Sequence, residues 1–382
     1  MSKVVFVANE LGAFRHHREH LARAVKRAGA EPVLLAAPVG DRAGLDYAFR
    51  PVDIERFRFD APRDWRLFVA VFSVLREEQP AVVHLINIKP YLYGGLAAAA
   101  ARAMGWRGRV VVTVAGLGRL HEPQAERTGS RAWLRRLLVE AFLRIALRGA
   151  QVTFETGHDR DVWLRRGLVR PDRVTVTRGT GVDLAQFAAC DRQPSRGRLR
   201  VLYAGRLLRA KGLEVFLEAA GRVDPEAVEM LVAGFSENDP DVISPGALGA
   251  HPHVTFLGQV DAMGELLRGV DVVVLASRYN EGVPRILIEA AAAGCVPVAT
   301  SFAGSRELID HGRTGFFLGS DLAGQADELA ALLQRLAGER ERVGAMGREA
   351  AAHVRAGGFA AETIAETFLG LYGLVSGQER PQ

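Results

Sequence analysis

Short runs of β-branched residues, each followed by a longer segment of helical periodicity, recur along this chain of 382 residues. The first half contains Val4–Ala8, Pro32–Ala36, Val82–Ile86, Val110–Val114, Val152–Glu155 and Val174–Thr177. The second half contains Val201–Ala204, Met230–Ala233, Val254–Leu257, Val272–Ala276, Val296–Thr300 and Phe316–Leu318. Strands that alternate with helices build parallel sheets covered by helices. We therefore predict an α/β protein with two doubly wound parallel sheets.

A polar stretch, CDRQPSRGR at residues 190–198, interrupts the alternation and is typical of a linker. We predict an N-terminal Rossmann-like domain over 1–189 and a C-terminal Rossmann-like domain over 199–382. The amphipathic segment Ala360–Val375 either completes the second domain or packs back on the first. Ligands of doubly wound sheets bind outside the carboxyl ends of the strands. The predicted site is therefore the cleft across which the two domains face each other.

Composition and charge narrow the class of protein. Hydrophobic residues make up 48% and charged residues 24% of the chain, as in an ordinary globular domain. The longest weakly polar stretches, Leu96–Ala103 and Leu287–Thr300, fall short of the roughly 20 apolar residues of a membrane span. Cys190 and Cys295 have no metal-type spacing, so we expect a reducing compartment, the cytoplasm. The net charge of +5 is compatible with nucleic acid, acidic phosphates or anionic membrane as partners.

A pair of carboxylates brackets the start of a predicted helix in the second half. The segment Glu281–Pro284 precedes the helix Arg285–Ala293, with the proline as the first helical residue. The start of a helix offers backbone N–H groups and a positive dipole end, which suit a diphosphate, and Gly282 allows close approach. Glu289 follows Glu281 by eight positions. On a helix that is on the order of 10 Å, which fits hydroxyls at both ends of a sugar nucleotide. The alternative is two solvated helix carboxylates.

Basic residues follow the first strand of the second half, in the segment Gly205–Gly212 (GRLLRAKG). A strand-to-helix turn with Arg206 and Lys211 between glycines places positive charge at the carboxyl end of the strand. Such charge can neutralise a leaving diphosphate. The alternative is an ordinary basic loop.

Three segments, Gly205–Gly212, Glu281–Val298 and Ala303–Phe316, together resemble the retaining glycosyltransferases of family 4, which have the GT-B fold. The resemblance implies that Arg206 and Lys211 bind the diphosphate, that Glu281 binds the transferred sugar and that Glu289 binds the ribose. It makes Glu281, Arg206 and Lys211 the candidate catalytic residues. The complete candidate donor site is Gly12, Gly205, Arg206, Lys211, Gly282, Val283, Pro284, Arg285 and Glu289, with the amides of Val283 to Arg285 facing the sugar and the β-phosphate.

The first half resembles a subgroup of family 4 that extends polyprenyl-diphosphate-linked sugars for bacterial surface polysaccharides. Its pattern H-x4-K-P-x-x-Y-G falls on His84–Gly94, and Ala115–Gly118 and Gly179–Asp183 also fit. The implied acceptor-binding residues are Phe14, His17, Arg18, His84, Lys89 and Tyr93. The alternative for the histidines near Gly12 is a solvated helix surface. Ala115 stands where many members carry a histidine, which leaves His84, His17 and His121 as more distant sugar contacts.

The segment Arg131–Arg148 combines a cluster of apolar residues with five arginines against the single Glu140. A basic amphipathic helix of this kind is typical of peripheral contact with an anionic cytoplasmic leaflet, where a lipid-linked acceptor is presented. A core helix with a solvated basic face explains the same pattern.

Two D-x-D sequences, Asp159–Asp161 and Asp239–Asp241, match the metal–diphosphate signature of a different glycosyltransferase fold. Helix capping and turn formation explain both, so we predict no essential metal and no cofactor. The predicted reaction is retaining transfer of a hexose or N-acetylhexosamine from a nucleotide sugar, UDP before GDP, to a saccharide acceptor. No nucleic-acid-binding motif is present. The alternatives are a nucleotide-sugar epimerase and a non-catalytic nucleotide-sugar-binding protein.

Overall fold

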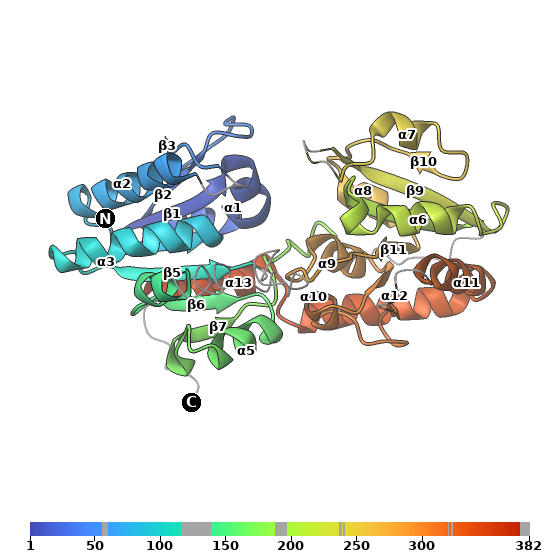
Figure 1. Cartoon of the computed structure of the whole chain (residues 1–382). Helices are drawn as coiled ribbons and strands as arrows, with labels where there is room; N and C mark the ends of the chain where they lie inside the picture. Colours follow the sequence, from blue (N-terminus) through green and yellow to red (C-terminus); the bar gives the residue numbers. More distant parts are fainter. Residues whose placement is uncertain are drawn as a thin grey trace. The chain divides into compact units, whose positions relative to one another are not determined.

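The computed structural model describes residues 1–55, 60–115, 139–187, 197–236, 239, 241–319, 321 and 324–374. The chain divides into two compact units, Met1–Thr180 with Ala361–Gln382, and Gly181–Ala360. Each unit contains one parallel sheet flanked by helices (Figure 1). The two doubly wound sheets predicted from the sequence are thus confirmed.

The first unit has a seven-stranded sheet in the order β3-β2-β1-β4-β5-β6-β7. Its strands are β1 Lys3–Glu10, β2 Glu31–Ala37, β3 Ala48–Pro51, β4 Val82–Ile86, β5 Arg109–Val114, β6 Gln151–Phe154 and β7 Val174–Val176. Its helices are α1 Leu11–Arg27, α2 Ala61–Glu77, α3 Gly95–Ala103, α5 Gly157–Arg165 and α13 Ala361–Tyr372, with a π-helical turn η1 at Pro90–Gly94 and a 3-10 turn η3 at Pro171–Arg173. All six predicted strands of this half are present, and β3 is an additional edge strand.

The second unit has a six-stranded sheet in the order β10-β9-β8-β11-β12-β13. Its strands are β8 Leu199–Arg206, β9 Val228–Phe235, β10 Thr255–Phe256, β11 Val272–Leu275, β12 Val296–Thr300 and β13 Phe316–Leu318. Its helices are the 3-10 turn η4 Arg209–Lys211, α6 Leu213–Ala220, α7 Pro245–Gly249, α8 Met263–Arg268, α9 Arg285–Ala292, α10 Ala303–Arg306, α11 Gln325–Gly338 and α12 Arg340–Ala356. Every strand predicted for this half is present.

The boundary between the units lies before the predicted linker. The amide of Val182 donates to the carbonyl oxygen of Phe359 at 3.0 Å, and Val182 and Phe187 belong to the apolar core of the second unit. Residues 181–187 therefore pack with the second unit, not with the N-terminal domain in which we expected them. Most of the predicted linker, 190–198, lies outside the described residues.

The final helix, α13, completes the first unit. Its residues Ile364 and Phe368 pack in one apolar cluster with Val4 and Phe6 of β1. Figure 1 shows α13, drawn in red, beside the strands of this sheet. The chain therefore returns to its first domain, one of the two placements that the sequence left open. In the described part of the chain, no helix is long and apolar enough to span a bilayer.

Candidate active site

The strand order of the second sheet reverses direction at β8 and β11, which lie side by side although β9 follows β8 in the chain. The crevice at such a switch point is where doubly wound sheets bind ligands. Arg206 ends β8, Lys211 lies in the segment that follows it, and the loop after β11 carries Glu281. The amide of Arg278 donates to the carbonyl oxygen of Ala210 at 2.9 Å, which joins the two loops. The topology thus brings together the two motifs of the C-terminal half.

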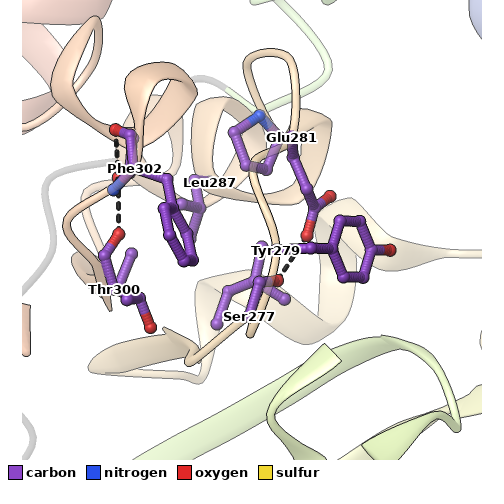
Figure 2. A pocket seen from close by; sticks show the side chains of 10 residues that line it. Ser277, Tyr279, Glu281, Leu287, Thr300 and Phe302 are labelled. Atoms are coloured by element: carbon purple, nitrogen blue, oxygen red, sulfur yellow. Dashed lines mark hydrogen bonds between the residues drawn. The ribbon is translucent and has the colours of Figure 1, made fainter. Parts of the chain in front are cut away.

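Glu281 is held by two partners from these loops. Lys211 Nζ donates to Glu281 Oε2. Ser277 Oγ donates to Glu281 Oε1, and Figure 2 shows these two side chains. The side chains of Lys211 and Glu281 are each 15% exposed, and Ser277 is buried. Because both carboxylate oxygens are occupied, Glu281 has a fixed orientation at the mouth of the crevice. Sequence reasoning missed Ser277, since a serine at a strand end carries no distinguishing signal.

The basic loop is shaped by contacts that need glycine at one position. Gly212 has φ +79°, and a Cβ there would lie 2.1 Å from the carbonyl oxygen of Ala276. Asp241 braces the same loop: its Oδ2 accepts from the amide of Ala210 at 2.7 Å, and its carbonyl oxygen accepts from the amide of Arg209 at 3.1 Å. This D-x-D aspartate therefore has a backbone-bracing role. In the other D-x-D sequence, the amide of Asp159 donates to the Thr156 cap of α5.

The helix predicted after the acidic motif is α9, which begins at Arg285. Pro284 is its N-cap and not, as we predicted, its first helical residue. A Cβ on Gly304 would lie 1.8 Å from the carbonyl oxygen of Gly282, so the acidic loop packs directly on α10. A small pocket lies beside this loop (Figure 2). Its lining includes Ser277, Tyr279, Glu281, Pro284, Thr300 and Phe302. Val283, within this loop, is buried.

Glu289 lies in α9 and is only 7% exposed. Arg285 Nε donates to its Oε1 at 2.6 Å. Burial raises the pKa of Glu289 above its usual value of 4.5, and the bond from Arg285 opposes that rise. Glu289 is thus a largely buried carboxylate on α9, and its contact with a ribose stays a prediction.

The raised pKa of Glu289 means that the folded state favours the protonated carboxyl group more than the unfolded state does. The stability associated with that form is fully present below pH 4.5 and is lost as the pH rises through the folded pKa. Glu289→Gln should therefore unfold at a higher temperature than the wild type at pH 7 by calorimetry, and equally at low pH. The same variant should bind nucleotide more weakly, because a neutral amide accepts a hydrogen bond less strongly than a carboxylate. Glu226→Gln, at an exposed turn, is the control; a less stable Glu289→Gln at pH 7 would contradict the argument.

Several residues expected to bind the acceptor lie inside the first unit. His84 is fully buried, with Nε2 hydrogen-bonded to Thr113 Oγ1 and Nδ1 to the Tyr372 hydroxyl of α13, both at 2.7 Å. Burial holds the pKa of His84 well below its usual value, and the charge of Arg18 adds to this effect. His84 is therefore a buried residue of the first unit's core, and its assignment to acceptor binding stays a prediction that these contacts do not favour.

Lys89 is also buried. Its Nζ lies 2.8 Å from Asp64 Oδ1, and both side chains are 2% exposed. Tyr93 bonds to the same aspartate; burial, with Asp64 adding to it, raises the pKa of Tyr93 to about 12. The pattern that indicated an acceptor site thus contains a buried ion pair between Lys89, which precedes η1, and Asp64 of α2. Acceptor contact by Lys89 stays a prediction.

The first helix, α1, carries the remaining predicted residues. Phe14 is buried, and Arg18 Nη2 lies 2.6 Å from Glu155 Oε1 in a buried ion pair. The amide of Gly12 donates to the carbonyl oxygen of Val39 at 2.8 Å, so the backbone of this glycine contacts the segment after β2. His17, partly exposed, stays a candidate acceptor contact. Both His121 and the segment 116–118 lie outside the described residues.

The buried Lys89–Asp64 pair gives a test that separates a structural role from acceptor binding. Lys89→Met leaves Asp64 charged and uncompensated, which should lower the free energy of unfolding by roughly 3–5 kcal/mol. Urea unfolding followed by tryptophan fluorescence reports on this unit, because all four tryptophans precede residue 180. The double variant Lys89→Met/Asp64→Leu should recover part of the loss. A fully stable Lys89→Met variant with a raised acceptor KM would instead restore the acceptor role.

Fold and site together define an α/β protein with cationic side chains at the switch point of a parallel sheet. Residues 198–337 match the family model for "Glycosyl transferases group 1", and residues 16–186 match that for "Glycosyltransferase Family 4". The crystal structure of Anabaena HepE in complex with UDP and glucose superposes with a TM-score of 0.74 at 18% identity, covering 98% of this chain and 100% of that one. Sucrose-phosphate synthase from Thermosynechococcus elongatus gives a TM-score of 0.76 at 19% identity, with 98% of each chain covered.

Curated relatives match part of the chain. D-inositol 3-phosphate glycosyltransferase of Nocardia farcinica is 32% identical over 221 residues, which are 53% of this chain and 47% of the relative. Phosphatidyl-myo-inositol mannosyltransferase of Mycobacterium tuberculosis is 33% identical over 174 residues, 43% of this chain and 45% of the relative. The chain thus spans about half the length of the curated relatives it matches. The chain belongs to glycosyltransferase family 4 and has the GT-B fold, as its motifs indicated.

Proposed function

We propose that this protein is a retaining glycosyltransferase that moves a hexose or N-acetylhexosamine from a nucleotide sugar to a saccharide acceptor. The observation that carries the proposal is the contact of Lys211 with Glu281 beside Arg206 at the switch point of the second sheet. Cations at this place suit a diphosphate, and a fixed carboxylate suits sugar hydroxyls. UDP is the favoured nucleotide, because the motifs resemble those of a UDP-sugar-using subgroup and the HepE neighbour was crystallised with UDP-glucose.

In the proposed reaction, the bond between the sugar's anomeric carbon and the diphosphate oxygen breaks, and the acceptor oxygen bonds to the same face of that carbon. The departing diphosphate oxygen takes the proton of the acceptor hydroxyl. Arg206 and Lys211 stabilise the charge that develops on the diphosphate. Glu281 already accepts from Lys211 and Ser277, which fits a role in orienting the sugar and not in forming a covalent intermediate. The scheme requires no metal ion, because the side chains supply the positive charge.

The acceptor is proposed to be a saccharide linked to a lipid diphosphate, used in surface polysaccharide synthesis. This part of the proposal comes from the subgroup resemblance of the N-terminal half. An enzyme with such an acceptor would work at the cytoplasmic face of a membrane as a peripheral protein.

The first test is a panel of UDP- and GDP-sugars assayed for nucleoside diphosphate release, with and without a polyprenyl-diphosphate-sugar acceptor. Glu281→Ala should reduce acceptor-dependent release about 100-fold or more, because it removes a contact to the reacting sugar. Glu226→Ala, at the exposed turn before β9, should behave like the wild type. Turnover of donor without any acceptor would favour the epimerase, and binding without turnover would favour the silent binding protein.

Membrane contact is a separate part of the proposal. Residues 139–146 are helical; Leu143 is buried in the core, whereas Phe142 and Ile145 are 48% and 51% exposed. Exposed apolar side chains near Arg144 and Arg148 suit the interface of an anionic bilayer. The preceding residues, 131–138, lie outside the described part of the chain.

Flotation with phosphatidylcholine vesicles, with and without phosphatidylglycerol, tests this contact. The wild type should float with the anionic vesicles, and Phe142→Ser/Ile145→Ser should bind them at least about 10-fold more weakly, because less apolar surface is buried. Met104→Ser, at a similarly exposed residue after α3, is the control. If the fraction of protein that floats does not depend on phosphatidylglycerol, membrane docking would be contradicted.

A further inference from the structure

Tyr279, on the loop between β11 and α9, contacts both cations of the proposed donor site. Arg206 Nη2 donates to the Tyr279 hydroxyl oxygen at 3.2 Å. Lys211 Nζ lies over the face of the same ring, 5.3 Å from its centroid. The two cations lie at the end of β8 and in the segment after it, whereas Tyr279 belongs to the loop after β11. One aromatic side chain therefore links the cations of one loop to the other loop.

The chemistry of tyrosine suits it to hold two cations that repel each other. Its hydroxyl oxygen accepts a hydrogen bond from a guanidinium, and its ring face attracts an ammonium group electrostatically. Both contacts leave the side chain neutral, so the positive charge of the cations stays available to an anion. A carboxylate in the same place would instead neutralise them, as Glu281 does for Lys211.

Other contacts fix the backbone of the basic loop, so Tyr279 is not required for its fold. The Tyr203 hydroxyl donates to the carbonyl oxygen of Arg206 at 2.6 Å, and the amide of Leu207 donates to the carbonyl oxygen of Phe235 at 3.1 Å. Asp241 accepts from the amides of Arg209 and Ala210. What Tyr279 contacts is the charged end of each side chain. Its role is therefore the direction of the two cations.

We propose that Tyr279 is a positioning residue for the donor diphosphate, which it serves by aligning Arg206 and Lys211 toward the phosphate oxygens. The inference rests on the donor site proposed above and deepens it. When the donor binds, Lys211 exchanges a carboxylate oxygen of Glu281 for a phosphate oxygen, and the ring keeps the ammonium group in place during this exchange. Tyr279 should therefore control affinity for nucleoside diphosphates and leave the affinity for the nucleoside unchanged.

The test measures binding of UDP and of uridine to the full chain by titration calorimetry, with GDP and guanosine as a second pair. Tyr279→Phe removes the bond to Arg206 and keeps the ring, and it should weaken UDP binding about 10-fold. Tyr279→Leu removes both contacts, and a further factor of about 3 is expected from loss of the ring over Lys211. Uridine binding should change in neither variant.

The matched control is Arg206→Ala, alone and combined with Tyr279→Phe. If the hydroxyl acts through the guanidinium, Tyr279→Phe should have no additional effect once Arg206 is removed. Additive losses, or an equal loss of uridine binding, would show a general structural role and overturn the inference. Wild-type UDP affinity in both tyrosine variants, with weak binding by Arg206→Ala, would overturn the role of Tyr279 and leave the proposed function intact. A wild type that binds neither UDP nor GDP would overturn both.

Discussion

The site depends on how closely the loop after β8 approaches the end of β11. At Gly212 the backbone lies so near Ala276 that a Cβ would stand 2.1 Å from the carbonyl oxygen of Ala276. This contact brings Lys211 within reach of Glu281 on the neighbouring loop. A side chain at position 212 would push the loops apart, and the ion pair, the ring contact of Tyr279 and the bond from Arg278 to Ala210 would all be lost together. The chemistry of the proposed donor site therefore rests on a steric condition of the backbone.

The fold could be predicted from the sequence because every buried strand of a parallel sheet is a short apolar run, and all twelve predicted runs are strands. The missed strand, β3, has the sequence AFRP and lies exposed at the edge of its sheet, so it shows no apolar pattern. The domain boundary was misplaced because Val182 pairs with Phe359 and Ala360, which are distant in the chain. Contacts of such sequence separation leave no local signal.

The candidate site also has one part that could be predicted from the sequence and one part that could not. Arg206, Lys211 and Glu281 lie at the ends of neighbouring strands, so strand order alone predicts that they lie close together. The burial of Lys89 and His84 could not be predicted, because a charged or polar side chain gives no indication of its own burial. Lys89 forms an ion pair with Asp64 of α2, and His84 is hydrogen-bonded to Tyr372, which is 288 residues away in the chain. Both partners became evident only in the folded arrangement.

Charge pairing links the architecture of the second unit to its proposed ligand. The carboxylates of Glu281 and Glu289 are each paired with a cation, Lys211 and Arg285. The proposed nucleotide sugar carries a diphosphate flanked by hydroxyl groups. Its phosphate oxygens can pair with the cations, and its hydroxyl groups can donate to the carboxylates. Partly buried charges that lose one partner and gain another avoid the desolvation penalty of an unpaired charge. A ligand without the diphosphate cannot make this exchange at Lys211, because it offers the ammonium group no anion to compensate for the loss of Glu281. The two ion pairs therefore favour ligands that carry both phosphate and hydroxyl groups.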